Sequence, residues 1–287
     1  MPEKPEEMTT SHSTYIHGSK ANEQARLAAL NEYLNSGYIG VVRPRRGDKI
    51  LDVGSGPGQF TLMMGEMTGH GTSVLGIERD ERQLEQARRM LGSAMPGIRD
   101  IARVEFRQGD AMNLPLDPEE WGGFDLAHAR FLLEHLPDPG SVVAGMAKAV
   151  RPGGRVFLSD DDHDVFRLTP EPPGFTELWR AYMRSYEVLG NDPHVGRHLV
   201  FLLKDAGLKS VRNGGMFFGA CADEPHFGMI ADNLIGILEG AGETMTGGGL
   251  ITPDVYDRAM AALRGWKKHP AAAQWYMLCW AEGLVKS

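Results

Sequence analysis

The chain has 287 residues, of which 42% are hydrophobic and 24% charged, and it carries a formal net charge of −8. This composition is typical of a folded globular protein, and the length suffices for one large domain or two small ones. The acidic balance argues against a nucleic-acid partner, because phosphate binding relies on clustered lysine and arginine. No run of about 18 apolar residues occurs, which argues against a membrane-spanning helix and a membrane partner.

The N-terminal segment and the two cysteines indicate where the protein functions and where its folded part begins. The N-terminus, MPEKPEEMTT, is polar and acidic without an apolar h-region, so secretion is not expected. Residues 1–14 are rich in Pro, Glu, Ser and Thr and are predicted to be disordered, with a single domain over 15–287. Cys221 and Cys279 lie far apart and form no metal-binding spacing, which favours a reducing, cytoplasmic setting.

The first ordered elements surround a glycine-rich turn. A helix is predicted from about Ala21 to Leu34, followed by a short buried strand from Ile50 to Val53 and a helix starting near Gln59. Three glycines between that strand and that helix leave no side chain over the turn, so a ligand can lie against the backbone. The N–H groups at the start of the helix then suit an anionic or strongly polar ligand group.

The turn has the pattern D-x-G-x-G-x-G over residues 52–58. A dinucleotide fingerprint would place glycine where Gln59 stands, which disfavours a nicotinamide oxidoreductase. The pattern resembles the first motif of class I S-adenosylmethionine-dependent methyltransferases. The resemblance implies S-adenosylmethionine as cofactor and S-adenosylhomocysteine as product, bound here by Asp52, Gly54, Ser55, Gly56 and Gln59. It also implies that Tyr15 closes over the cofactor, although ordinary packing explains Tyr15 equally well.

A second strand is predicted from Ser73 to Ile77 and ends in Glu78. An acidic side chain about 20 residues past the glycine turn can accept hydrogen bonds from both ribose hydroxyls, whereas the alternative for Glu78 is plain surface charge. Asp80 is expected to cap the next helix, with Gln83 completing the start. Arg79 and Gln83 are assigned to the cofactor site with Glu78.

A third strand is predicted from Val104 to Gln108, and the segment G-D-A-x-x-L-P follows it. This segment resembles the methyltransferase motif whose aspartate accepts a hydrogen bond from the adenine amino group. The resemblance assigns that role to Asp110 and places Gly109, Ala111 and Met112 beside the adenine ring. A carboxylate acceptor suits an exocyclic amine that carries two protons.

A fourth strand is predicted from Phe124 to Ala129, followed by R-F-L-L-E-H-L-P-D-P. This stretch resembles small-molecule methyltransferases related to the ubiquinone and menaquinone enzymes. The carboxyl end of this strand is expected to be the switch point of the sheet, where ligands bind. Ala129 and Arg130 are therefore expected to line the sulfonium and methyl-transfer region, and His135 either packs over the cofactor or caps the turn.

A fifth strand, Arg155 to Ser159, leads into four carboxylates and one imidazole at residues 160–164. His163 is a candidate general base or substrate contact, because imidazole takes up a proton near neutral pH and Asp162 or Asp164 could orient it. The alternatives are a solvated loop and, less favoured, a metal site; no metal is assigned. His128 and His194 are the other candidate bases.

Two helical insertions, about 163–194 and 222–270, are predicted to form a lid over the substrate. A stripe of large side chains on the first insertion and after it indicates an apolar or aromatic acceptor, namely Trp179, Tyr182, Tyr186, Phe217 and Phe218. The glycine-rich segment Gly240 to Gly249 is predicted to be a flexible link. The last strand is predicted over Gln274 to Ala281, and the family resemblance implies that it pairs antiparallel.

The alternation of strands and helices predicts an α/β protein with a doubly wound, mostly parallel sheet. The resemblance implies a Rossmann-like sheet of seven strands. The predicted function is methyl transfer from S-adenosylmethionine to oxygen, nitrogen or carbon of a small molecule. The alternative is a protein that binds S-adenosylmethionine as a regulator without transferring the methyl group, and a homodimer stays open.

Overall fold

The computed structural model describes residues 21–93 and 102–286, with side chains from residue 31 onward. The expectations for residues 1–14 and for Tyr15 lie outside the described residues. A seven-stranded sheet in the order β3-β2-β1-β4-β5-β10-β7 forms the centre, and β10 runs antiparallel to both of its neighbours. The strands are β1 (Lys49–Val53), β2 (Thr72–Glu78), β3 (Ala102–Gln108), β4 (Phe124–Arg130), β5 (Val150–Asp160), β7 (Lys209–Phe217) and β10 (Met277–Leu284).

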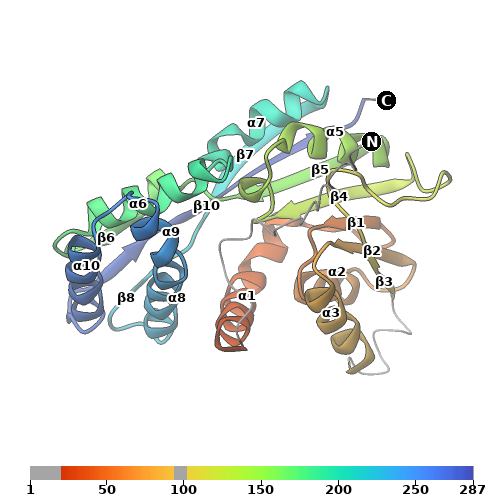
Figure 1. The fold of residues 1–287 in the computed structure, drawn as a ribbon. Helices are drawn as coiled ribbons and strands as arrows, with labels where there is room; N and C mark the ends of the chain where they lie inside the picture. The colour runs from red at the N-terminus through yellow and green to blue at the C-terminus, as the bar shows by residue number, and fades with distance from the viewer. Residues whose placement is uncertain (1–20, 94–101, 287) are drawn as a thin grey trace, which may run out of the picture.

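Helices cover both faces of this sheet (Figure 1). One face carries α5 (Pro139–Ala149) and α7 (Val195–Asp205), and the other carries α1 (Ala21–Val42), α2 (Gln59–Thr68) and α3 (Glu81–Ser93). The alternation of side chains along a strand explains both layers, because Ile50 packs among the α1 and α2 side chains while Leu51 packs among those of α5. The prediction of a doubly wound, mostly parallel sheet is confirmed.

β1 lies between β2 and β4. The chain therefore adds strands first on one side of β1 and then on the other. The carboxyl ends of these parallel strands meet at one edge, and ligands bind at such a reversal point in doubly wound sheets. The loops after β1, β2, β3 and β4 therefore form the floor of any site.

A second group of elements gathers beside the end of the main sheet (Figure 1). It contains α6 (Phe175–Val188), α8 (Phe227–Gly240), α9 (Gly242–Gly247), α10 (Pro253–Trp266) and a small antiparallel sheet of β6 (Arg167–Thr169), β9 (Ala273–Trp275) and β8 (Ala220–Cys221). Two short 3-10 helices, Leu133–His135 and His163–Val165, lie where the main sheet meets this group.

Two sequence expectations fail in this second group. The segment Gly240 to Gly249 is not a flexible link, because it contains α9 and the side chain of Met245 is fully buried. The predicted strand from Gln274 to Ala281 is two strands, β9 and β10, with Tyr276 between them. Each half pairs with a different sheet, which a continuous apolar pattern does not reveal. Among the described helices, none is both long and apolar enough to cross a bilayer.

Candidate active site

A cavity of about 880 Å³ opens at the carboxyl ends of the parallel strands and extends under the second group of helices. Its first end is lined by the loops that follow β1, β2 and β3. This end brings together most of the residues assigned to the cofactor, namely Asp52, Gly54, Ser55, Gly56, Glu78, Arg79, Gln83, Gly109, Asp110 and Ala111. Segments far apart in the sequence thus meet at one edge of the sheet.

The glycine-rich turn after β1 packs tightly and is itself well bonded. Gly58 has a φ of 82°, and a Cβ there would lie 2.6 Å from the ring of Phe106. Only glycine fits such a position without moving its neighbours. The N–H groups of Gly54 and Ser55 both donate to the carbonyl of Ile77 at 2.9 Å. The turn therefore offers a ligand an open backbone surface rather than the N–H groups of these two residues.

Glu78 holds the turn from the end of β2. Its carboxylate accepts from the N–H of Gly56 at 2.9 Å and from the N–H of Asp80 at 2.8 Å. Burial raises the pKa of Glu78, while these N–H donors oppose the shift. A carboxylate has about four acceptor positions, so Glu78 can still accept from a ribose hydroxyl group.

Asp80 caps α3 as predicted, because its Oδ1 accepts from the N–H of Arg82 at 2.8 Å and of Gln83 at 3.1 Å. Asp110 closes a tight turn after β3, and its Oδ1 accepts from the N–H of Met112 at 2.9 Å. That N–H is therefore engaged within the turn, and the side chain of Met112 lies outside the cavity.

His128 lies at the cavity wall, but both of its ring nitrogens are engaged. Nδ1 is 2.7 Å from Oδ1 of Asp52, and Nε2 is 2.9 Å from the hydroxyl of Tyr38. The other oxygen of Asp52 accepts from the hydroxyl of Thr61 at 2.6 Å. This buried chain of hydrogen bonds ties β1, β4, α1 and α2 together, so the structure does not favour His128 as a base.

Arg130, at the end of β4, offers a cation to the cavity. Its guanidinium stacks over the rings of Tyr38, Phe60 and Phe131 at 4.8, 4.9 and 5.6 Å, and its Nη2 donates to Asn31 at 3.3 Å. Its Nη1 is buried without a hydrogen-bond partner among the described residues. A positive group with a free donor suits a carboxylate of the ligand better than the sulfonium that the sequence analysis placed beside it.

The far end of the cavity holds His163 close to the carboxyl group of Glu134. Nε2 of His163 lies 3.2 Å from Oε2 of Glu134, and its Nδ1 lies 3.3 Å from the hydroxyl of Tyr276. Burial lowers the pKa of His163, and it raises the pKa of Glu134 to about 8 with a further contribution from Asp192. Burial also raises the pKa of Asp161 well above its usual range.

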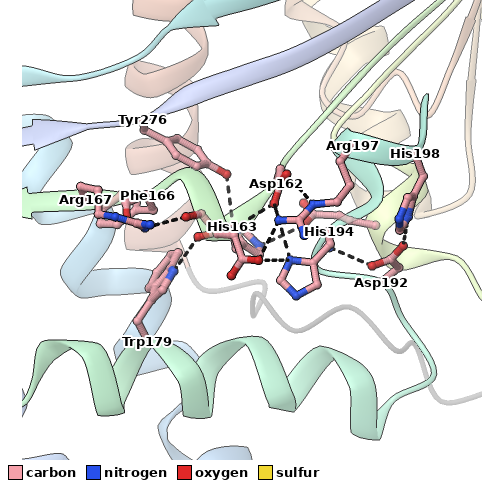
Figure 2. A network of polar contacts seen from close by, with 12 residues as sticks. Asp162, His163, Phe166, Arg167, Trp179, Asp192, His194, Arg197, His198 and Tyr276 are labelled. Carbon is pink, nitrogen blue, oxygen red and sulfur yellow. Dashed lines mark hydrogen bonds and ion pairs between the residues drawn. The ribbon is translucent and has the colours of Figure 1, made fainter. Parts of the chain in front are cut away.

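The partners expected for His163 are engaged elsewhere, which corrects the sequence prediction. The guanidinium of Arg197 binds Asp162 with both Nε (2.7 Å) and Nη2 (2.6 Å), and it reaches Asp164 at 2.7 Å. His194 lies 3.6 Å from Asp162 and outside the cavity. Figure 2 shows this network on one side of His163, with Trp179 and Tyr276 on the other.

Aromatic rings enclose the far end. Four of them, from Phe166, Trp179, Tyr182 and Tyr186, line the cavity, and Trp179 donates to the carbonyl of His163 at 2.8 Å. Phe218 lines it as well, whereas Phe217 does not, because its half-exposed ring packs on Trp275. The stripe predicted on the first insertion therefore faces the cavity.

The residues that the sequence assigns to the site thus fall into two groups, those that line the cavity and those that do not. Arg130, His128, His135 and His163 line the cavity with the loop residues, and the ring of His135 stacks on Tyr186. The structure places Gln59, Met112, Ala129 and His194 away from it, and Ala129 packs in the core between the sheet and α5.

Sequence reasoning missed several polar groups that line the cavity, among them Glu134, Asp161 and Gln274. Glu134 stands next to His135 in a motif already singled out, and Asp161 belongs to the acidic run before His163. No local pattern marks Gln274.

The chain matches a known protein family and resembles curated proteins in sequence. The profile of the methyltransferase-domain family matches residues 44–190. A 27-O-demethylrifamycin SV methyltransferase from Amycolatopsis mediterranei is 35% identical over 55% of this chain and 53% of its own length. A ubiquinone biosynthesis O-methyltransferase from Marinobacter nauticus is 30% identical over 52% of this chain and 63% of its own length.

The fold is shared more widely. A crystal structure from Bacillus halodurans, of a protein described as a methyltransferase, aligns with 88% of this chain and 99% of its own at a TM-score of 0.55 and 16% identity. The chain spans about half the length of the curated relatives it matches. It belongs to the methyltransferase-domain family, with the Rossmann-like sheet expected of that class.

Proposed function

We propose that the protein transfers a methyl group from S-adenosylmethionine to a small-molecule acceptor. The observation that carries the proposal is one cavity with two different ends. The end at β1, β2 and β3 presents an open glycine turn with Glu78 and Asp110, and the end under α6 presents aromatic rings with His163. Such an arrangement can hold two reactants face to face, and well-aligned reactants can lower a barrier by about 7–11 kcal/mol.

The residues of the first end fit the parts of the cofactor. Glu78 accepts from the ribose hydroxyls, Asp110 accepts from the adenine amino group, and Nη1 of Arg130 binds the carboxylate of the methionine part. The sequence did not suggest this ion pair between Arg130 and the carboxylate of the cofactor. The relatives named above act, by their names, on a rifamycin and in ubiquinone biosynthesis, which supports a small-molecule acceptor.

His163 is the group that we propose as base for an acceptor that must lose a proton. His163 is the candidate among the three histidines whose ring faces the aromatic end, because His128 is held on both nitrogens and His194 lies outside the cavity. Its lowered pKa keeps the imidazole neutral near pH 7 and therefore able to accept a proton.

We also propose a cytoplasmic setting without nucleic acid or membrane as partner. The net charge of −8 supports the absence of nucleic acid, and both cysteines are free, which suits a reducing compartment. Light scattering would decide between a monomer and a homodimer.

Calorimetric titration with S-adenosylmethionine, S-adenosylhomocysteine and NAD tests the central proposal. We expect both adenosyl compounds to bind and NAD not to bind. A screen of acceptors for a mass gain of one methyl group then separates an enzyme from a binding protein that only regulates. Binding of NAD in place of the adenosyl compounds would refute the proposal.

A further inference from the structure

The far end of the cavity contains buried oxygen atoms that lack hydrogen-bond donors. Oε2 of Glu134, Oδ1 of Asp161 and Oε1 of Gln274 each have no hydrogen-bond partner among the described residues. Nε2 of His163 approaches Oε2 of Glu134 to 3.2 Å, but the two atoms are not aligned as a hydrogen bond. Glu134 and Gln274 are 3% exposed, and all three acceptor residues line the cavity. Leaving buried polar atoms unpaired is costly, so such a group of atoms points to a ligand that supplies donors.

We propose that the acceptor carries an amino group and that this group binds as an ammonium ion between Glu134, Asp161 and Gln274. The inference rests on the proposed function and names its substrate class. An ammonium group offers three donors and no acceptor. Carboxylate oxygens of Glu134 and Asp161 lie within 4.8 Å of each other, and Gln274 adds an acceptor in the same cavity. A hydroxyl group brings a single donor and adds acceptor atoms of its own, so it would leave some of these oxygens unpaired.

The carboxyl groups of the far end also suit a cation. The largest electrostatic influence on Glu134 comes from Asp192, and those on Asp161 come from Glu134, His163 and Asp160. Arg197 holds Asp162. Arg130 stacks on the ring of Tyr38 and donates to Asn31, and its free Nη1 is the group proposed above to bind the cofactor. Two carboxyl groups therefore share a buried space without a lysine or arginine partner in the described segments, and a bound cation would favour their charged forms.

The surrounding rings favour an organic cation. The rings of Trp179, Tyr182, Tyr186 and Tyr276 lie 5.3 to 6.4 Å from the ring of His163 (Figure 2 shows Trp179 and Tyr276). Aromatic faces attract alkylammonium groups by cation–π interaction, most strongly where water is excluded. Carboxylates within a set of aromatic rings thus match the charge and the apolar surface of a substituted amine.

A divalent metal ion is the competing occupant. Ligand atoms of Glu134, Asp161 and His163 lie within 4.8 Å of one another, a spacing that could accept an ion. Hard cations such as Mg²⁺ keep several water or oxygen ligands, and ring faces supply none. The geometry therefore points to the amine, and the experiment includes the metal as an outcome that would overturn it.

The test compares amines with alcohols of the same shape. Calorimetry on the full chain saturated with S-adenosylhomocysteine would titrate benzylamine, phenethylamine and cyclohexylamine against benzyl alcohol, phenethyl alcohol and cyclohexanol. We expect at least one amine to bind about tenfold or more tightly than its alcohol, since a charged hydrogen bond is roughly twice as strong as a neutral one. We expect Glu134→Gln and Asp161→Asn each to remove most of that preference, while the control Glu177→Gln, on the exposed side of α6, keeps it.

Several results would overturn the inference. These are equal binding of every amine and its alcohol, no binding of any amine, or an unchanged preference in Glu134→Gln and Asp161→Asn. Tight binding of Mn²⁺ that blocks the amine, with loss of methyl transfer in EDTA, would assign the far end to a metal. If a carboxyl variant does not fold by circular dichroism, Gln274→Met removes one acceptor at similar volume and should weaken amine binding alone.

The same titrations separate this inference from the proposed function. Failure of S-adenosylhomocysteine to bind would remove the proposed function, and the amine series would then be measured on the free protein. Binding of S-adenosylhomocysteine without preference for any amine would keep methyl transfer and discard the amine.

Discussion

Burial, more than residue type, decides the protonation states of Glu134 and His163. Removal from water disfavours the charged form of either group, so it raises the pKa of Glu134 to about 8 and lowers the pKa of His163. Near pH 7 the carboxyl group is therefore protonated and the imidazole is neutral. Without a bound cation the far end carries little net charge, although its composition is acidic.

The raised pKa of Glu134 makes the stability of the ligand-free protein depend on pH. The folded state binds this proton up to about pH 8, whereas an unfolded glutamate releases it near 4.5. Between these values the folded state holds more protons, so the free energy of unfolding falls as pH rises, by at most about 1.4 kcal/mol per pH unit.

Urea unfolding of the wild type and of Glu134→Gln between pH 7 and 8 measures this effect. We expect the stability of the wild type to fall more steeply, because the glutamine side chain of the variant cannot titrate and the remaining slope comes from other groups such as Asp160 and Asp161. Below about pH 6.5 the slope reflects His163 as well, since protonation of an unfolded histidine favours unfolding there. Identical slopes for the two proteins would show that Glu134 is ionised in the fold.

At the scale of elements, the sequence predicts the parts whose signal is local. The strand ending in Val53, its glycine turn and the helix from Gln59 appear as predicted, because apolar runs, glycine and capping residues act within a few positions. The prediction for the glycine-rich segment that contains α9 was wrong, because contacts with distant parts of the chain decide its structure. Glycine predicts flexibility locally, but Met245 anchors this short helix in a core formed with α6, α8 and α10.

Met245 should therefore be essential to the second group of helices. Met245→Ala removes a fully buried side chain and is expected to cost about 2–5 kcal/mol of the free energy of unfolding. Met67→Ala in α2 is the matched control, since Met67 is 66% exposed and its loss should change stability by less than about 0.5 kcal/mol. Denaturant melts of both variants measure the difference. An equal, small effect would mean that the α9 segment is loose in solution.

At the scale of the whole molecule, the two ends of the cavity differ in how far the sequence predicts them. Glu78 ends β2 and Asp110 lies in the turn directly after β3, so the sheet fixes their positions and a motif reveals them. Glu134 and Asp161 follow the neighbouring strands β4 and β5, whereas Gln274 reaches the cavity from a small sheet that the sequence does not predict. The main sheet brings the first two together, and packing of the second group on the main sheet adds Gln274.

This separation predicts that the two ends act independently. Glu78→Ala should weaken binding of S-adenosylhomocysteine by about 1–3 kcal/mol, the usual cost of a lost buried partner. His163→Ala should leave that affinity unchanged and lower turnover about 10²–10⁴-fold, the usual contribution of a general base. Calorimetry gives the first quantity, and single-turnover kinetics at saturating cofactor gives the second.

The double variant then decides whether the ends are coupled. Residues without shared partners usually contribute additively within about 0.5 kcal/mol, and no interaction of Glu78 with His163 is found in the described parts of the chain. We therefore expect the double variant to show both losses in full, each in its own measurement. A loss of cofactor affinity in His163→Ala, or a non-additive double variant, would mean that the second group of helices closes on the cofactor itself. In that case these helices take part in binding both reactants, and the acceptor end could not be altered without changing the cofactor end.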